Sequence, residues 1–478
     1  MDAFFAELDR INGQVYLYGL VGLLVAVGLW LTIATRGVQV RHFGAMVRSL
    51  TRSRAGAQGG ISSFQAFAIG MATRIGIGNI TGVALALILG GPGAIFWMWV
   101  VAAVGMATGF AEATLAQVFK VRAPDGTFRG GPAFYVSVGL RSRGWGVLFA
   151  VLLIFAMVVA MPMVQSNTIA VALEAAQGVP TGVTGVVVAA LTALVVFGGV
   201  RGVARAAELI TPLMALAYVA IALAVIVANL THVPAFLGDI LAGAFGLREG
   251  LAGLGGGVMV ALLNGAQRGL FSNEAGMGTA PNGAATATVA HPVQQGFVQS
   301  LGVFIDSMVI CTATAFIILS TDASGYVPGV TPREEAASLT TNAVVGQLGA
   351  WASWPMLVMI FFFGFSSILG AYAYAQVNLD FLGGPRWSRF VLAAVTVATT
   401  GIGAVQALPH VWILMDSAMA LITVVNLAGL VALTGWVRAA LADHEERVRR
   451  GDGAPPDAFS SAVLPDPDAA PAWRGAAA

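Results

Sequence analysis

Long apolar stretches recur along this chain and constrain its fold more than any other feature. A window of about 19 residues finds about eleven stretches that could each supply the roughly 20 helical residues needed to cross a hydrocarbon core. Lipid offers backbone groups no hydrogen-bond partner, so such segments must be helical. The sequence therefore predicts an all-α integral membrane protein with about 11 transmembrane helices, at about residues 13–35, 62–89, 93–119, 145–176, 182–200, 206–230, 252–280, 293–320, 351–382, 389–406 and 411–437.

Composition supports the membrane assignment and excludes several classes of protein. Hydrophobic residues make up 58% of the chain and charged residues 10%, against roughly 25% charged in a soluble domain. The 24 basic and 23 acidic residues nearly cancel, so we expect no nucleic-acid partner. No zinc-protease, nucleophile-elbow or Walker motif is visible. We expect no enzyme activity and no organic cofactor, although Glu112, Glu274 and Asp306, within or near predicted spans, keep an intramembrane enzyme as a rival.

Arginine placement predicts how the chain is oriented in the membrane. Arg and Lys gather in alternate loops, which marks those loops as cytoplasmic. With an odd number of spans, the N-terminus lies outside and the C-terminus lies in the cytoplasm. The basic residues on the cytoplasmic side include Arg36, Arg41, Arg48, Lys120, Arg129, Arg141, Arg205, Arg389, Arg438 and Arg447.

The predicted organisation is one transporter-sized domain, residues 1–440, followed by a cytoplasmic tail, residues 441–478. From residue 451 the tail is rich in Pro, Ala and Asp, so we expect it to be disordered because it cannot bury enough apolar surface to offset its ordering entropy.

Two similar Gly-rich interruptions suggest an internal repeat. After an extra first helix at about 13–35, the other ten spans divide into two sets of five, at 62–230 and 252–437, and an odd number of crossings inverts the second set. The leading helix of each set carries Gly and Asn at an apparent break, Gly76-Ile77-Gly78-Asn79 in the first and Asn264-Gly265 through Gly278 in the second. Matched breaks of this kind are typical of inverted repeats that bind ligand near the midplane.

The broken ends have the polarity needed for an amino acid and a cation. Free N–H groups at a half-helix N-terminus suit a carboxylate, and carbonyls at a C-terminal end suit Na⁺. Tight packing between helices explains the spacing of Gly78 and Gly82 about as well as ligand binding does. Ser366 and Ser367 offer neutral oxygens to a monovalent cation, against the simpler reading that they bond their own helix. Gln165, just after Pro162, is a candidate cavity residue or an interhelical hydrogen-bond donor.

Several motifs, in order, resemble the alanine or glycine:cation symporter family. The resemblance covers about residues 60–385, with compatible helices to about 440. The motifs are Gly76-Ile77-Gly78-Asn79-Ile80, Gly90 to Trp99, Phe128-Arg129-Gly130-Gly131-Pro132, Ser272 to Gly278, Gly302 to Asp306 and Cys311 to Ala315.

This resemblance implies a bacterial leucine-transporter-type fold, a 5+5 inverted repeat preceded by one extra helix, in the bacterial inner membrane. It implies symport of a small neutral amino acid with Na⁺ as coupling ion, or with H⁺ as the alternative. By the resemblance, the substrate is bound by Gly76, Ile77, Gly78, Asn79, Gln165, Gly265, Phe271, Asn273 and Ala371, and Na⁺ by Ser366 and Ser367 together with backbone carbonyls near Thr73 and Gly76.

Departures from the family pattern bear on substrate size. Ile77 stands where the family commonly has Thr, and Ala371, Ala373 and Gln376 lie in a segment usually richer in large or polar residues. Smaller side chains enlarge a cavity when their neighbours do not collapse, and one methylene changes selectivity by roughly 1 to 3 kcal/mol. We therefore expect a substrate larger than glycine, with glutamine included. A channel is the remaining rival, although it would need a continuous polar pore.

Overall fold

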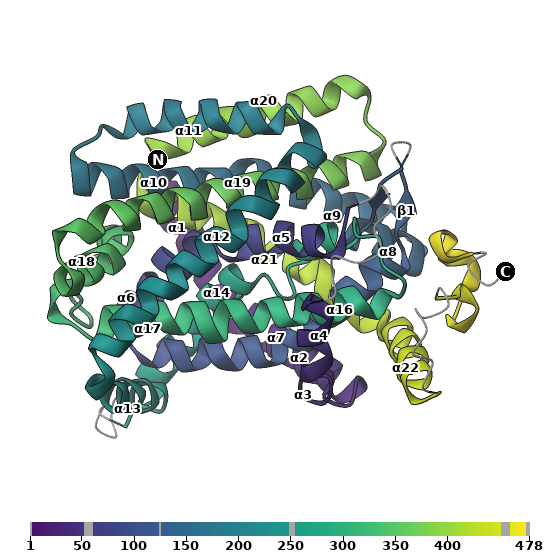
Figure 1. The fold of residues 1–478 in the computed structure, drawn as a ribbon, viewed down its shortest axis with the longest axis horizontal. Coiled ribbons are helices and arrows are strands. Elements are labelled where there is room, and N and C mark those ends of the chain that lie inside the picture. The colour runs from purple at the N-terminus through teal and green to yellow at the C-terminus, as the bar shows by residue number, and fades with distance from the viewer. Residues whose placement is uncertain (1, 52–60, 124–125, 248–253, 451–458, 475–478) are drawn as a thin grey trace.

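The computed structural model describes residues 2–51, 61–123, 126–247, 254–450 and 459–474, and these are almost entirely helical (Figure 1). The exception is a short hairpin between β1 (Val121–Arg122) and β2 (Phe128–Arg129), which pair antiparallel with Val121 opposite Arg129. The all-α prediction is confirmed.

Eight helices of the described chain are long and apolar enough to cross a membrane, and one bent pair adds a ninth. Three of the eight are pairs of α-helices joined by wider π-helical turns. The eight are formed by α1 (Asp2–Val15) with α2 (Val21–Ala34), α7 (Gly93–Val118), α9 (Arg143–Phe155) with α10 (Met161–Gln177), α12 (Gly199–Ala228), α16 (Pro292–Phe304) with α17 (Thr312–Leu319), α19 (Ser353–Leu382), α20 (Arg386–Ala404) and α21 (Leu408–Ala432). The bent pair is α5 (Ser63–Arg74) and α6 (Val83–Gly90).

The remaining helices are shorter or less apolar, and two of them correspond to predicted spans. The predicted span at 182–200 is a helix of 16 residues, α11 (Thr181–Val196), and that at 252–280 is α14 (Leu254–Asn273), which carries Asn264, Gln267 and Arg268. The others are α3 (Val38–Arg41), α4 (Phe43–Thr51), α8 (Pro132–Gly139), α13 (Val233–Ala244), α15 (Ala280–Ala284), α18 (Ala336–Leu348) and α22 (Thr434–Arg450).

Burial separates central helices from peripheral ones. In the most apolar 18-residue window, 83% of residues are buried for the helix Ala350–Leu382 and 72% for Pro292–Leu319, against 28% for Gly202–Ala228 and 33% for Ala3–Ala34. The central elements α5, α14, α16 and α19 lie between an outer layer that contains α11 and α20 and another that contains α2 and α7 (Figure 1). The polar and broken segments are therefore enclosed by apolar helices.

The outer face of α12 shows what the peripheral helices present to their surroundings. Leu209, Leu213 and Leu216 are 65 to 73% exposed, and Leu223 and Val227 continue the same helical stripe. A contiguous apolar stripe on an exposed helix is a liability in water and is expected against lipid.

The C-terminal segment differs from the predicted disorder of residues 441–478. Residues 441–450 continue α22, and part of the segment from 459 to 474 packs against the helical domain. Phe459 is fully buried and its N–H donates to the Ala290 carbonyl at 3.1 Å, while the Trp473 indole N–H donates to the Gln117 carbonyl at 2.8 Å. The prediction from composition was wrong for these residues because Phe459 and Trp473 are buried against the helical domain, so the segment needs no hydrophobic core of its own.

Candidate substrate and ion site

A break between α5 and α6 is the centre of the site. Helix α5 ends at Arg74, Ile75 has non-helical backbone angles, and the chain resumes as a π-helical turn at Gly78–Gly82 before α6. The two halves are bent by 46°. All of residues 75–82 are buried, so the predicted interruption at Gly76 to Asn79 is present and lies inside the protein.

Close approach of neighbouring helices requires glycine at two positions of this break. A Cβ placed on Gly76 would lie 2.3 Å from the Ser367 Oγ of α19, and one placed on Gly78 would lie 2.8 Å from the Phe271 ring of α14. A side chain at these positions would displace the Ser367 hydroxyl or the Phe271 ring, so glycine lets the unwound backbone approach both helices closely.

Asn79 connects the break to a buried carboxylate. Its Oδ1 accepts from the Gly76 N–H at 2.9 Å, and its Nδ2 donates to Asp306 Oδ1 at 2.6 Å. The other oxygen of Asp306 accepts from the hydroxyls of Ser272 at 2.8 Å and Ser307 at 2.9 Å. The amide therefore supplies the broken helix with a hydrogen-bond acceptor and is held in place by the π-helical turn Ile305–Cys311.

The second break lies after α14, at residues 274–279. Glu274 has a left-handed backbone with φ of 57° and is fully buried. Its Oε2 accepts from the Thr279 hydroxyl at 2.8 Å and lies 3.2 Å from the Thr73 hydroxyl of α5. Thr73 also lies 2.9 Å from the Tyr374 hydroxyl of α19. The contact between Thr73, in the last turn before the first break, and Glu274, in the second break, thus joins the two breaks.

Glu112 of α7 satisfies backbone groups that the second break exposes. Its Oε1 accepts from the Gly278 N–H at 3.0 Å and from Asn426 Nδ2 at 2.5 Å, and the same Nδ2 lies 2.9 Å from the Gly276 carbonyl. An unpaired backbone group at this depth would cost several kcal/mol, so Glu112 and Asn426 stabilise the loop.

Four neutral oxygens meet where α19 crosses the end of α5. The Ser367 hydroxyl lies 3.0 Å from the Ala72 carbonyl and 2.9 Å from the Phe363 carbonyl, and the Ser366 hydroxyl lies 3.2 and 3.1 Å from the same two atoms. Each hydroxyl has one hydrogen and can donate to only one carbonyl at a time. Neutral oxygens brought together in this way suit a hard monovalent cation such as Na⁺.

The predicted ion ligands are therefore partly side by side. Ser366 and Ser367 contact the last turn of α5 and Gly76 approaches Ser367, while the Thr73 hydroxyl belongs to the Glu274 network. The Ala72 carbonyl lies next to Thr73, where the resemblance places a backbone ligand, whereas the Phe363 carbonyl was not among the sequence candidates.

Of three further substrate candidates, Gln165, Ala371 and Phe271, only Phe271 is seen to approach the break. Gln165 of α10 is buried, its Nε2 lies 3.2 Å from Met161 Sδ, and its Oε1 has no partner among the described residues. Ala371 is fully buried in α19. Phe271 stacks obliquely on Trp412 with ring centroids 4.6 Å apart and covers Gly78.

The last two substrate candidates, Asn273 and Gly265, both lie on α14 but differ in their surroundings. Asn273 holds the helix end, since its Oδ1 accepts from the Ala275 N–H at 2.9 Å and its Nδ2 donates to Ser307 at 3.1 Å. Helix α14 is continuous through Asn264 and Gly265, so the break predicted from residue 264 begins only at 274. A Cβ on Gly265 would lie 2.3 Å from the Ala94 carbonyl, so this glycine allows α14 to pack on α7.

A hollow of about 230 Å³ lies beside Trp412, whose ring packs against Phe271. Trp412 is part of its wall, as are Arg268 and Asp416, which form a buried ion pair at 2.5 Å. The Arg268 guanidinium also lies 4.8 Å from the centre of the Trp412 ring. Leu85 and Leu89 of α6 also line this hollow, so it reaches the second half of the broken helix but not the residues of the break itself.

Asp306, Glu274 and Tyr374 were not among the substrate or ion ligands predicted from the sequence. Their position at the breaks follows from tertiary contacts between residues more than 200 positions apart for Asn79 with Asp306 and Thr73 with Glu274. The available signal was that ionisable groups within membrane spans are costly and often functional.

A helical membrane protein with discontinuous helices around buried oxygens is typical of a secondary transporter, and comparison with known proteins agrees. The model of the sodium:alanine symporter family matches residues 1–457. The chain is 42% identical over 433 residues to a probable sodium/glutamine symporter of Bacillus subtilis, covering 90% of this chain and 89% of that protein. It is 42% identical to the amino-acid carrier protein AlsT of the same organism, covering 94% of each, and 36% identical to the sodium/alanine symporter AgcS of Methanococcus maripaludis, covering 91% and 96%.

This chain belongs to the sodium:alanine symporter family. The resemblance to that family and the assignment as an integral membrane transporter are confirmed. Because the family and these relatives are transporters, the prediction that the chain is not an enzyme is also confirmed.

Proposed function

We propose that this chain imports a small neutral amino acid together with Na⁺ by alternating access. The observation that carries the proposal is the group of four neutral oxygens formed by Ser366, Ser367 and the carbonyls of Ala72 and Phe363. It lies at the C-terminal end of α5, where the helix dipole adds partial negative charge. A cation at this end therefore gains both ligands and a favourable field.

The substrate carboxylate would bind at the opposite end of the break. The helix that resumes at Gly78 has no side-chain cap at its N-terminus, although the Asn79 N–H donates to the Gly76 carbonyl at 3.1 Å, and helix N-termini favour an anion. Asn79, Ile77 and Phe271 border this position, and Gln165 carries an unpaired amide oxygen suited to an ammonium group. Buried Ala371 limits the cavity less than a larger residue would, which favours substrates from alanine to glutamine.

We further propose eleven membrane helices arranged as one extra helix and a 5+5 inverted repeat within residues 1–440. The corresponding discontinuities, α5 with α6 and α14 with α15, support the repeat because both occur in the leading helix of a set of five. Arginine-rich loops favour an external N-terminus and a cytoplasmic C-terminus. In this orientation the hollow beside Arg268 and Asp416 opens outward, and Phe271 with Trp412 closes it from the substrate.

H⁺ coupling is the second candidate, favoured by one observation. Glu274 Oε1 is buried with no partner among the described residues, while Oε2 contacts Thr73 at the end of α5. A buried carboxylate in this situation is a candidate proton carrier. One relative, from Bacillus subtilis and 38% identical, is named a putative sodium/proton-dependent alanine carrier protein.

Coupled binding to the purified protein distinguishes these proposals. Binding of labelled alanine and glutamine is measured in Na⁺ and in K⁺, each at several pH values. Na⁺ symport predicts an affinity about tenfold or more higher in Na⁺, since coupling between sites is typically 1 to 3 kcal/mol and reciprocal. An affinity that responds to pH and not to Na⁺ would favour H⁺, and one indifferent to both would contradict symport.

A further inference from the structure

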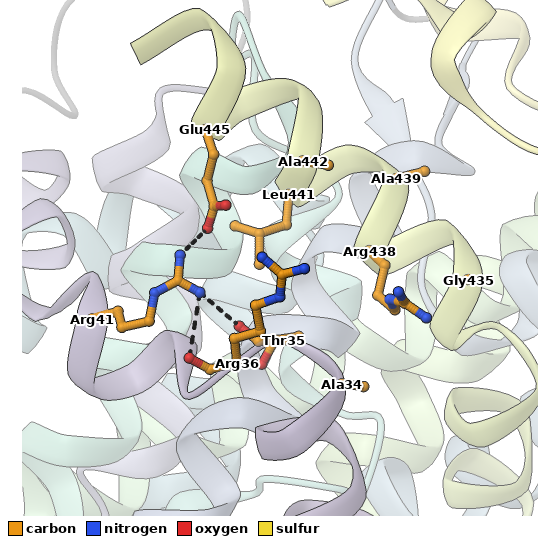
Figure 2. A pocket seen from close by; sticks show the side chains of 10 residues that line it. All are labelled: Ala34, Thr35, Arg36, Arg41, Gly435, Arg438, Ala439, Leu441, Ala442 and Glu445. Atoms are coloured by element: carbon orange, nitrogen blue, oxygen red, sulfur yellow. Dashed lines mark hydrogen bonds and ion pairs between the residues drawn. The ribbon is translucent and has the colours of Figure 1, made fainter. Parts of the chain in front are cut away.

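A basic pocket lies far from the broken helices, between the end of α2 and the start of α22. It has a volume of about 390 Å³ and is lined by ten residues (Figure 2). Three of them are arginines, Arg36, Arg41 and Arg438, and only one, Glu445, is acidic. Three positive charges against one negative leave a net charge of +2, so the pocket favours an anion.

The charges in this pocket are unequally paired. Arg41 donates to Glu445 at 2.5 Å, and His42 shares the same carboxylate oxygen at 2.9 Å. Arg36 and Arg438 are exposed and line the same hollow (Figure 2), and neither forms an ion pair with a carboxylate among the described residues. The only acidic side chain of the pocket is thus occupied by Arg41, and two guanidinium groups remain for a ligand.

Arg36, which lines the pocket, has a left-handed backbone conformation. Arg36 has φ of 54°, a left-handed conformation at the end of α2 where glycine is usually preferred. The following Gly37 N–H bonds back to the Thr32 carbonyl at 2.7 Å, which closes the helix end. Non-glycine residues are uncommon in this conformation, and the guanidinium is a physical reason to tolerate the strain.

The pocket lies at the level where lipid headgroups meet the hydrocarbon core. Two candidate spans end beside it, Ala3–Ala34 and Leu408–Ala432, and the lining begins at Ala34 and Gly435. The Trp30 indole N–H donates to the Thr434 hydroxyl at 3.1 Å and joins the two ends. Tryptophan in this position is typical of a membrane interface.

Exposed apolar side chains continue from the pocket along the same helices. Ile33 is 73% exposed and Trp30 51% exposed on α2, and Val431 is 43% exposed on α21. A free anion would use only the arginines, whereas a phospholipid would place its phosphate on them and its acyl chains on this surface. Basic pockets next to apolar spans are suited to anionic headgroups.

We propose that this pocket binds the phosphate headgroup of an anionic phospholipid, which would link α2 to α22. The site is separate from the broken helices, and the proposal requires only that the spans beside it lie in a bilayer. Inorganic phosphate shares the headgroup chemistry but has no acyl chains, so it distinguishes the two sources of phosphate.

Thermal unfolding of the purified full chain in neutral detergent tests the proposal. The additives are phosphatidylglycerol, cardiolipin, phosphatidylcholine and inorganic phosphate. We expect the two anionic lipids to raise the melting temperature of the wild-type protein and the other two to leave it unchanged, because a ligand that binds only the folded state stabilises it. Equal protection by inorganic phosphate, or by phosphatidylcholine, would overturn the lipid assignment.

Three variants and one control variant locate the effect. Arg438→Gln removes one guanidinium, and Arg36→Gly removes the other while placing glycine in a backbone it prefers, so its melting temperature without lipid should be unchanged or higher. The combined variant should lose the lipid-dependent shift. Arg143→Gln, an exposed arginine at the start of α9, should keep it. A full lipid-dependent shift in the combined variant would overturn the site.

Discussion

Asn79 Nδ2 lies 2.6 Å from Asp306 Oδ1, and this contact joins the break after α5 to the π-helical turn between α16 and α17. The same amide accepts the Gly76 N–H at 2.9 Å. One side chain thus terminates the unwound backbone and ties it to a helix of the second proposed repeat. Movement of either element would have to break this pair or carry it along, so the pair would connect the proposed ion and substrate sites to a conformational change.

Replacing Asn79 tests whether this connection matters for transport. Asn79→Ala leaves the Gly76 N–H and one Asp306 oxygen without their partner, at roughly 1.5 to 3 kcal/mol for a hydrogen bond to a charged group. We expect amino-acid uptake by proteoliposomes to fall about tenfold or more while the protein remains inserted and monodisperse. Asn264→Ala is the control, because Asn264 Nδ2 donates only to Val260 of its own helix. Equal uptake by both variants would contradict the role of Asn79.

Ser367→Ala tests the ion site. Removing the hydroxyl leaves two carbonyls and one hydroxyl of the four oxygens, so the Na⁺ concentration for half-maximal uptake should rise roughly tenfold, equivalent to about 1.4 kcal/mol. The maximal rate at saturating Na⁺ should change less. Ser388→Ala is the matched control, since Ser388 donates to Pro385 at the start of α20. An unchanged Na⁺ dependence in Ser367→Ala would mean that Na⁺ binds elsewhere.

His444 on α22 predicts a loss of stability in acid. Burial lowers the pKa of His444 from 6.5 to about 4, with the nearby charges of His291 and His42 as further causes. Between these two pH values the unfolded chain binds the proton and the folded protein does not, so the free energy of unfolding falls as the pH falls from about 6.5 to about 4. His444→Gln should flatten this part of the melting-temperature profile.

The control for that profile is His232→Gln, which replaces an exposed histidine before α13. Its melting temperatures should follow those of the wild-type protein at each pH. Parallel profiles for His444→Gln and the wild-type protein would show that His444 does not titrate in this range.

The packed C-terminal segment predicts local protection. Trp473 is 5% exposed, its indole N–H bonds to Gln117, and Lys120 Nζ lies 4.6 Å from its ring centre. Trp473→Ala should lose about 3 kcal/mol or more of local packing, and hydrogen exchange of residues 459–474 should accelerate. Val463→Ala, at a residue already 40% exposed, should leave exchange nearly unchanged. Similar exchange in both variants would show that the aromatic contact does not hold the segment.

The first break was predictable from sequence because its chemistry is local. Gly76, Gly78 and Asn79 stand within four residues, and the structure has the interruption there. The second break was placed too early, because Asn264-Gly265 has the same local appearance. Only the contact of Gly265 with the Ala94 carbonyl shows that this glycine serves helix packing.

Contacts across the chain account for the rest of the site. Ser366 and Ser367 were identified by resemblance, and their contact with the Phe363 carbonyl lies within their own helix, as the simpler interpretation expected, but the Ala72 carbonyl meets them only because α19 crosses α5. In the same way, the Pro- and Ala-rich tail has the composition of a disordered segment. Its residues Phe459 and Trp473 are nevertheless buried against a surface formed by residues distant in the sequence. Periodicity and composition describe what a segment can do alone and miss what a neighbour adds.

The most direct test of the account is uptake of labelled alanine, glycine, serine and glutamine into proteoliposomes under an imposed Na⁺ gradient. Parallel vesicles carry K⁺ alone or an H⁺ gradient alone, and Ser367→Ala is measured beside the wild-type protein. The account predicts accumulation above equilibrium for at least one of the four amino acids, with Na⁺ only, and a weaker Na⁺ response in the variant. Uptake that only equilibrates, or that is the same in Na⁺ and K⁺, would contradict Na⁺ symport.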